Sequence, residues 1–202
     1  IRYSYNEDYY QQTQYQGIPK NGYKDIFVNL TKNKNIRIKY KEKYDLKYRI
    51  KPKYLTIYTG PLDSLFNYKF GKLEWRSLSF KKEVKKTRDF QGTSVINYPD
   101  LKNKFTRVHE PKHLHPERKP FNSNQTLVIK EYSIKNDNEP YYPINDEVNR
   151  IKHRKYKFEA SKIKKFEFGG RLADYAYYDM DMTISAALKK FEQIKKKIKW
   201  KF

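Results

Sequence analysis

Apolar and polar positions alternate along much of the chain, which is the pattern of half-buried β-strands. Ile36, Ile38 and Tyr40 are separated by basic residues and predict a strand with a basic outer face. Pro52 ends that run, and residues 54–58, which are richer in apolar side chains, predict a more deeply buried strand. Four further strand candidates are separated by turn residues, at 72–84, 93–100, 105–115 and 125–133.

Helical patterns occur at the start, in the middle and at the end of the chain. Short helices are predicted within 23–30 and 60–71, and a basic helix within 147–165. The clearest helix covers 181–199, because its apolar residues recur at helical spacing opposite a set of lysines. Its apolar stripe consists of Ile184, Ala187, Leu188, Phe191, Ile194 and Ile198. Together these elements predict an α+β fold with a largely antiparallel sheet, short helices and a C-terminal amphipathic helix.

We expect one partial domain over residues 1–202, long enough to bury a core. It comprises a tyrosine-rich opening segment, 1–30, a sheet region, 31–146, and a basic helical C-terminal region, 147–202. An aromatic content of 17% argues against disorder. The lack of cysteine excludes disulfides, a zinc ribbon and a cysteine nucleophile. No transmembrane segment is predicted, since no apolar run approaches the roughly 20 residues that a membrane-spanning helix needs.

The sequence starts at Ile1 without a signal-peptide pattern. We therefore expect a preceding segment to have been cleaved, encoded separately or left out.

The excess of positive charge changes the functional interpretation. The chain has 45 Lys and Arg against 23 Asp and Glu, a net charge of +22, which favours a polyanionic partner. Nucleic acid is the commonest such partner, and an anionic membrane surface is the second. Two segments carry nearly all the excess: residues 20–53 hold 12 basic and 3 acidic residues, and residues 150–202 hold 16 and 6. The alternative is a basic but solvated surface.

Aromatic residues alternate with the lysines of both segments and offer stacking surfaces beside phosphate-binding groups. The predicted nucleic-acid contacts are Lys39, Lys41, Lys43, Lys195, Lys196 and Lys197. RNA and the neighbouring proteins of a ribonucleoprotein are therefore predicted partners. The alternative is a lysine-rich strand edge and helix face that only meet water.

Three histidines, His109, His113 and His115, lie close together in the sequence, and the last two would share one face of a strand. Such a pair can bind a metal. Because no cysteine and no well-placed third carboxylate accompany them, we predict no metal site. Asp179 and Asp181 pose a similar choice between a carboxylate pair for acid–base chemistry and caps of the last helix, and capping is the commoner role.

Six collinear blocks of the sequence resemble one family. The blocks are "YQGIPKNGY", "YTGPLDSLFNYKFGKLEWRSLSF", "DFQGTSVINYPD", "FTRVHEPKHLHPER", "EPYYPINDE" and "FGGRLADYAYYDMDM". In this order they resemble UDP-galactopyranose mutase, the flavoenzyme family that contracts the galactose ring, and they cover nearly the whole chain. The resemblance implies the fold of the C-terminal part of such an enzyme, and for the three histidines it implies a structural loop beside the active site.

The resemblance also implies roles for individual residues. In this family reduced FAD uses its N5 atom as a nucleophile on the anomeric carbon of the sugar, without net redox change. The implied flavin contacts are Arg76, Arg171 and Asp179. The implied contacts of the substrate diphosphate are Tyr142, Tyr177, Arg107 and, from the start of a mobile loop, Arg2. Arg2 and Arg107 are the family-matched candidates for catalysis, while Tyr175 and Tyr178 are expected in the core or in the ligand pocket.

One motif of the family is missing. Its FAD domain begins with a dinucleotide-binding G-x-G-x-x-G turn, and the seven glycines of this chain do not have that spacing. We therefore expect no cofactor in the isolated chain, and FAD only if the missing half is supplied. Either a separate chain carries that nucleotide-binding half, or the flavin site is vestigial.

Two functions remain open. The first is a structural, RNA-contacting subunit of a large ribonucleoprotein, built from a mutase-like fragment. It explains the missing half and the charge, and the Lys, Asn, Tyr and Ile bias favours a mitochondrial ribosome and a mitochondrial location. The second is the C-terminal part of an active FAD-dependent mutase, an isomerase of the cytoplasm, whose N-terminal half is missing or on another chain. It explains the retained Arg, Tyr and Asp residues, but the charge places the ribonucleoprotein first.

Overall fold

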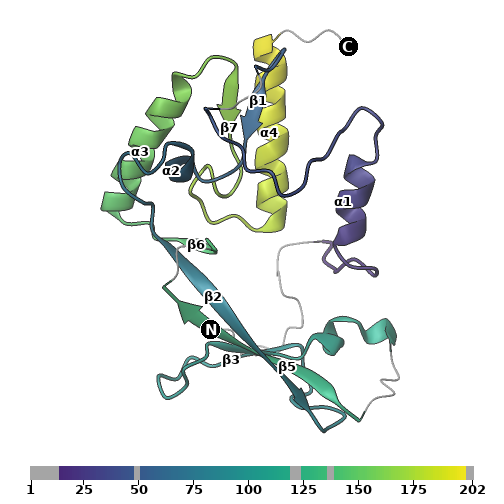
Figure 1. Ribbon diagram of the computed structural model, residues 1–202. Helices are drawn as coiled ribbons and strands as arrows, with labels where there is room; N and C mark the ends of the chain where they lie inside the picture. The colour runs from purple at the N-terminus through teal and green to yellow at the C-terminus, as the bar shows by residue number, and fades with distance from the viewer. Residues whose placement is uncertain (1–13, 48–50, 119–123, 136–138, 199–202) are drawn as a thin grey trace. The chain divides into compact units, whose positions relative to one another are not determined.

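The computed structural model describes residues 14–47, 51–118, 124–135 and 139–198 (Figure 1). The helices are α1 (Lys24–Thr31), α2 (Leu62–Leu65), α3 (Glu147–Ser161) and α4 (Met180–Ile198), with 3-10 helices at Pro111–Leu114 and Pro116–Arg118. The strands are β1 (Thr56–Tyr58), β2 (Trp75–Lys85), β3 (Val95–Asn97), β4 (Arg107–His109), β5 (Thr126–Ile134), β6 (Tyr142–Pro143) and β7 (Phe166–Phe168). This mixture of helices and strands confirms the predicted α+β class.

The strands form two sheets. Five of them are ordered β3-β4-β5-β2-β6, with antiparallel pairing of β4 with β5 and of β2 with β6. The other two strands, β1 and β7, pair in parallel over three residues each. Parallel strands need a long crossover, and here all five strands of the other sheet lie between β1 and β7 in the sequence.

The chain divides into two compact units that are not consecutive in sequence. Unit 1 consists of the described parts of 1–42, 83–96 and 110–128, and unit 2 of those of 43–82, 97–109 and 129–202. The strands β2 and β5 each begin in one unit and end in the other. Most of the residues with an implied ligand contact belong to unit 2.

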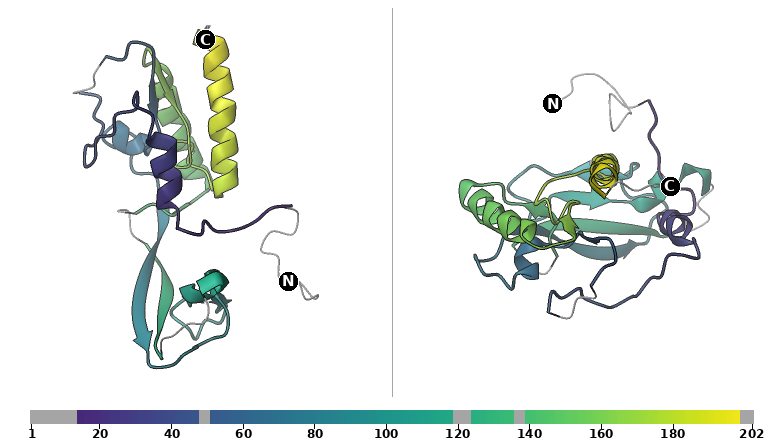
Figure 2. Two further views of the ribbon diagram at one scale, coloured as in Figure 1. Left: turned by 90° about the vertical axis from the view of Figure 1, so that its right-hand side faces the viewer. Right: turned by 90° about the horizontal axis from the view of Figure 1, so that it is seen from above.

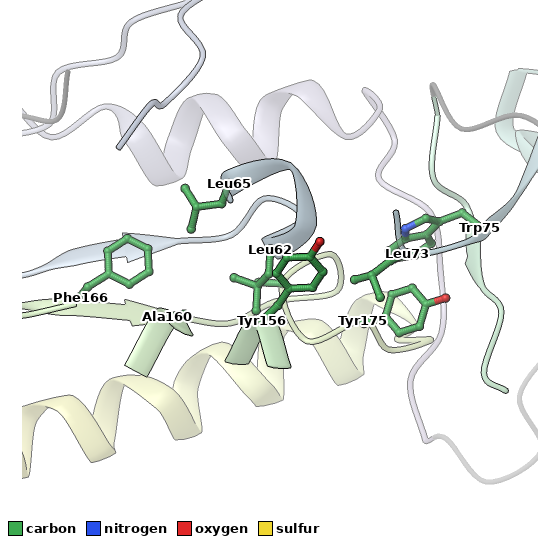
Figure 3. Close-up of a cluster of buried hydrophobic side chains, with 9 residues drawn as sticks. Leu62, Leu65, Leu73, Trp75, Tyr156, Ala160, Phe166 and Tyr175 are labelled. Carbon is green, nitrogen blue, oxygen red and sulfur yellow. The ribbon is translucent and has the colours of Figure 1, made fainter. Parts of the chain in front are cut away.

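The core of unit 2 is built from α2, α3, β7 and the loop after β7 (Figure 3). Its buried residues are Leu62, Leu65, Leu73, Trp75, Tyr156, Ala160, Phe166, Ala173 and Tyr175. The strands β1 and β7 lie between α3 and α4 (Figures 1 and 2). The hydroxyl of Tyr156 accepts a hydrogen bond from the Phe70 amide at 2.9 Å and donates to the Gly71 carbonyl at 2.8 Å, which fixes the loop after α2 on α3.

Buried polar side chains join the elements of this core. The Asp63 carboxylate accepts from the Ser64 amide at 2.8 Å and from the Leu73 amide at 2.9 Å, so it ties α2 to the start of β2. Asn149, which is fully buried in α3, accepts from the Glu74 amide at 3.1 Å. Asp146 caps α3 by accepting from the Asn149 amide at 2.8 Å. These bonds hold the beginning of β2 against α2 and α3.

The C-terminal helix α4 leaves most of its apolar stripe uncovered by the described residues. Ile194 is buried, whereas Ile184 and Leu188 are 61% and 63% exposed. An apolar pocket of about 400 Å³ lies between α4, β1 and the loop after β7, and Ile57 of β1 is 56% exposed. None of the described helices is long and apolar enough to cross a membrane.

The strand predicted from the alternation of Ile36, Ile38 and Tyr40 is wrong, because residues 32–47 form no strand in the structure. Ile36 and Ile38 are each 46% exposed and Tyr40 is 80% exposed, so the alternation buries nothing. A strand is stable only when a neighbouring strand satisfies its backbone groups. The backbone of Lys41 is left-handed, with φ of 60°, which also interrupts an extended run.

Candidate functional site

The centre of the candidate site is a stacked pair of tyrosines in unit 2. The ring of Tyr142, in the short strand β6, lies 5.6 Å from the ring of Tyr177, with an interplanar angle of 26°. Tyr142 is half-buried, and Tyr177 is 55% exposed in the loop before α4. Two residues that the sequence places far apart, and that the resemblance assigns to one diphosphate, therefore lie side by side.

Two arginines lie beside this pair. Arg76 in β2 is directly opposite Tyr142 in the antiparallel register, so the two side chains extend from the same face of the sheet. Arg76 is exposed. The guanidinium of Arg171 donates to the carbonyl of Pro140 at 3.3 Å, two residues before Tyr142. The structure thus brings together four residues with implied roles, two as flavin contacts and two as diphosphate contacts.

The loop from Gly169 to Asp179 carries Arg171 and Tyr177, and local hydrogen bonds define its path. The carboxylate of Asp174 accepts from the Gly170 amide at 3.1 Å and from the Tyr178 hydroxyl at 3.3 Å. Gly170 adopts φ of 87°, a left-handed conformation that costs glycine little. Burial, followed by the neighbouring Asp174 carboxylate, raises the pKa of Tyr178, which keeps this phenol protonated as a donor.

Asp179 lies directly before α4. Its carbonyl accepts from the Thr183 amide at 2.9 Å and from the Thr183 hydroxyl at 3.0 Å, which starts the helix at Met180. Asp181 follows in the first turn, where a carboxylate is stabilised by the positive end of the helix dipole. Asp179 and Asp181 therefore lie at the start of a helix, where the free backbone amide groups can also bind an anion.

Arg107 has a different environment from the tyrosine pair. In β4 it faces Glu131 of β5, and its Nε donates to the Asn97 side chain at 2.8 Å, while Nη1 lies 3.8 Å from a Glu131 carboxylate oxygen. His109 also contacts Glu131, at 3.0 Å. Arg107 is thus held within a small polar cluster on β3, β4 and β5. Arg2, its implied counterpart, lies outside the described residues.

Sequence reasoning did not identify Glu131 or Asn97 as partners of Arg107. The signal was present in part, because Thr126 and Val128 alternate with exposed positions in β5 and Glu131 interrupts that pattern at a buried position. A buried carboxylate requires a cationic or hydrogen-bonding partner. Which basic residue provides it depends on the β4–β5 register, which the sequence alone does not reveal.

His113 and His115 do not lie on a strand, so the expectation that they share a strand face is wrong. His113 lies in the 3-10 helix Pro111–Leu114 because Pro111 removes a backbone donor and ends the strand. His113 contacts Asp89 at 3.2 Å and Glu110 at 3.5 Å, whereas His115 contacts Glu117 at 2.9 Å. His113 and His115 therefore contact different carboxylates.

Asp89, Glu110 and His113 do converge, with their donor atoms within 4.8 Å of one another. The ammonium group of Lys112 lies 2.9 Å from Glu110 and already neutralises that carboxylate. A cation at this place would compete with Lys112. The geometry therefore suits a structural ion-pair cluster in unit 1 better than a metal centre.

The six lysines with predicted nucleic-acid contacts lie on separate segments. Lys39 forms an ion pair with Glu42 at 3.3 Å, close to Lys41 and Lys43 in the sequence. Lys195, Lys196 and Lys197 form the last basic turn of α4, and Lys197 pairs with Glu167 at 2.7 Å. The contact of these lysines with nucleic acid stays a prediction.

Comparison with known proteins places this geometry in a family context. The family model described as UDP-galactopyranose mutase matches residues 1–177. The chain is 35% identical to the UDP-galactopyranose mutase of Mycoplasma genitalium, over 95% of the chain and 50% of that relative. It is 33% identical to a probable UDP-galactopyranose mutase of Klebsiella pneumoniae, over 94% of the chain and 48% of the relative.

A third relative has a different sugar in its name. The chain is 32% identical to the dTDP-fucopyranose mutase of Escherichia coli, over 93% of the chain and 51% of that relative. The chain thus spans about half the length of the curated relatives it matches.

Proposed function

Because this chain belongs to the UDP-galactopyranose mutase family, we propose that it supplies the substrate-facing and flavin-facing half of a nucleoside-diphosphate sugar mutase. The observation that carries the proposal is the stacked Tyr142–Tyr177 pair beside Arg76. The names of the relatives include both a UDP and a dTDP sugar, so the proposed substrate class is a nucleoside-diphosphate hexopyranose.

The chemistry of the pair suits a diphosphate. Each phenol hydroxyl can donate one hydrogen bond, and the two rings that carry them stack with centroids 5.6 Å apart. A hydrogen bond to a charged phosphate oxygen is worth about 1.5–3 kcal/mol. Because Tyr177 is more than half exposed, its hydroxyl can reach a ligand without repacking of the core. The tyrosines would bind and orient the diphosphate so that the sugar lies against the flavin.

The residues fit one portion of FAD. Arg76 is exposed, Arg171 uses one N–H group on Pro140 and has others to offer, and Asp179 precedes the amide groups at the start of α4. These donors would hold the flavin and the chain attached to it. When reduced, the flavin supplies the nucleophile of the reaction. The adenosine portion needs a dinucleotide-binding turn, which the glycine spacing of this chain does not provide.

The proposed partner is therefore a nucleotide-binding half on a preceding segment or a separate chain. The uncovered stripe of α4 supports this, because a contiguous exposed apolar surface commonly marks an interface. Leu188 and Ile184 would be buried by such a partner. Arg76 and Arg171 would attract the anionic substrate and cofactor.

The first test isolates the native assembly that contains this chain and measures its flavin absorbance together with its nucleic-acid content. Stoichiometric flavin, together with interconversion of the pyranose and furanose forms of UDP-galactose under reducing conditions, is the expected result. RNA without flavin would contradict the proposal. Replacing Tyr177 by Phe in the same assembly should lower turnover at limiting substrate.

The net charge of +22 favours a second candidate, the RNA-contacting subunit of a ribonucleoprotein such as a mitochondrial ribosome. In that case the flavin contacts are vestigial and the lysines of α4 meet phosphate groups. Phosphate-driven association falls steeply with ionic strength, whereas a sugar nucleotide held by two tyrosines and an arginine is much less sensitive to salt. A salt titration of the native assembly therefore separates the two candidates.

A further inference from the structure

The hydroxyl of Tyr175 lies at a convergence of backbone groups inside unit 2. Tyr175 is 7% exposed, and its hydroxyl lies 3.1 Å from the Ile144 amide, 2.9 Å from the Ile144 carbonyl and 2.5 Å from the Glu74 carbonyl. A phenol has one hydrogen to donate and can accept two. It therefore accepts from the Ile144 amide and donates to one of the two carbonyls at a time.

These backbone groups belong to the strands that carry Arg76 and Tyr142. In the β2–β6 ladder, Trp75 faces Pro143 and Arg76 faces Tyr142. Glu74 and Ile144 are the next residues at that end of the two strands, and the Ile144 amide also donates to the Glu74 carbonyl at 3.0 Å. The Tyr175 hydroxyl thus closes the end of this short ladder.

The ring of Tyr175 is also held in place, by packing against two other rings. It meets the Trp75 ring edge-on, with centroids 4.9 Å apart (Figure 3), and the His153 ring at 5.5 Å. The backbone of Tyr175 is left-handed, with φ of 49°, which is unusual for a bulky residue. Such a conformation persists where the surroundings determine it, and often at functional sites. Burial holds the pKa of Tyr175 well above its ordinary value, so the hydroxyl keeps its proton.

We propose that Tyr175 is the positioning residue of the tyrosine pair, because its hydroxyl joins the loop that carries Tyr177 to the strand ends that carry Arg76 and Tyr142. Tyr177 follows Tyr175 by two residues, so a fixed Tyr175 determines where the loop meets β6. The importance of this position for a diphosphate rests on the proposed function. The geometric claim, that the Tyr175 hydroxyl holds the Tyr142 and Tyr177 rings together, is independent of the proposed function.

The test replaces Tyr175 by Phe in the full chain, which keeps the ring against Trp75 and removes only the hydroxyl. Tyrosine rings are labelled selectively, and the nuclear Overhauser effect between the Tyr142 and Tyr177 rings is measured by NMR. The expected result is loss of that signal in Tyr175→Phe. The matched control is Tyr156→Phe, since Tyr156 is another buried tyrosine whose hydroxyl bridges two backbone groups, at Phe70 and Gly71. An unchanged signal in Tyr175→Phe, or equal loss in both variants, would overturn the proposal.

A second measurement covers the case in which Tyr175→Phe does not fold. In the unaltered chain the Ile144 amide should exchange its hydrogen slowly, together with the Ala176 amide, which donates to the Arg171 carbonyl within the same loop. Fast exchange of the Ile144 amide beside a protected Ala176 amide would show that the hydroxyl does not hold the ladder end, and would contradict the inference.

Titration with UDP separates this inference from the proposed function. If the unaltered chain binds UDP, Tyr175→Phe should raise the Kd about tenfold and Tyr156→Phe should leave it unchanged. If the unaltered chain and its native assembly bind neither UDP nor flavin, the proposed function fails. The ring-to-ring signal then still decides whether Tyr175 positions the pair.

Discussion

The hydroxyl of Thr126 donates a 2.6 Å hydrogen bond to the carboxylate of Glu110, which is completely buried in unit 1. The same carboxylate accepts from the Gln91 amide at 2.9 Å and from the Phe90 amide at 3.1 Å, and it pairs with the Lys112 ammonium. Three segments of unit 1, around Phe90, Lys112 and Thr126, therefore depend on one ionised side chain. Burial alone would raise the pKa of Glu110, but these donors outweigh it and lower the pKa to about 2.

Glu110→Gln should therefore lower the free energy of unfolding at neutral pH by about 3 kcal/mol, because it leaves Lys112 and two amides without a charged acceptor. The pKa is lowered from 4.5, so the stabilisation is complete above pH 4.5 and is lost as the pH falls toward 2. Urea unfolding between pH 2 and 7 measures the free energy of unfolding of Glu110→Gln and of the unaltered protein. The difference between the two free energies should shrink as the pH falls from 4.5 toward 2. Glu192→Gln, an exposed change on α4, is the control. A constant difference at all pH values would contradict the assignment.

The exposed ring of the tyrosine pair gives a prediction about affinity. Tyr177→Phe should raise the Kd for a UDP sugar about tenfold, because it removes one hydrogen bond to a charged phosphate. It should leave thermal stability within about 0.5 kcal/mol of the unaltered protein, since Tyr177 is 55% exposed. Calorimetric titration of the native assembly measures the first quantity and thermal unfolding the second.

Tyr54→Phe is the matched control for that change, because Tyr54 is 53% exposed in the same unit and lies before β1. Equal loss of affinity in both variants would mean that the effect does not arise at the pair. Tyr177→Ala should lose more affinity than Tyr177→Phe, since it also removes the ring that stacks on Tyr142.

The sequence predicted most elements of the fold because their periodicity reflects burial. The helix expected at 147–165 is α3, and the strand expected at 72–84 is β2, where Trp75 and Ser77 are buried and Arg76 is exposed. The strand expected around Ile38 did not form, since periodicity alone does not provide a partner. The parallel pairing of β1 with β7 also escaped prediction, because it joins short segments distant in sequence.

The site was predictable only through the family resemblance. Nothing in the local spacing of Tyr142 and Tyr177 indicates that they stack, since their contact depends on the left-handed turn at Tyr175 and on the β2–β6 register. The assignment of Arg107 to the same diphosphate stays a prediction. In the structure its guanidinium contacts Asn97 and Glu131.

The uncovered face of α4 gives a prediction about the proposed nucleotide-binding half. Leu188→Lys should leave the stability of the chain unchanged, because Leu188 is 63% exposed, but it should prevent association with a nucleotide-binding half. The probe is the half of the Mycoplasma genitalium relative that this chain does not match, co-expressed as a separate polypeptide. Co-purification and retained flavin are measured together.

Two further variants control this experiment. Lys189→Ala alters an exposed position on the same helix and should not affect association. Ile194→Ala should destabilise the chain by about 2–4 kcal/mol, because Ile194 is 3% exposed and its loss leaves a cavity. If Leu188→Lys associates as well as the unaltered chain, the stripe of α4 is not the surface that the other half covers.

The basic last turn of α4 distinguishes the two candidate functions. Replacing Lys195, Lys196 and Lys197 together by Glu should abolish RNA association if the chain is an RNA-contacting subunit, and should leave the affinity for a UDP sugar unchanged. Association through six or more phosphates should also weaken by roughly 10³ between low and moderate salt. Filter binding at several salt concentrations measures both effects.

A triple Glu variant at the exposed residues Lys86, Lys102 and Lys104 makes the same change in net charge elsewhere on the chain and is the control. Equal loss in both triple variants would indicate a general effect of charge, and unchanged association would exclude the last turn of α4 as the RNA contact.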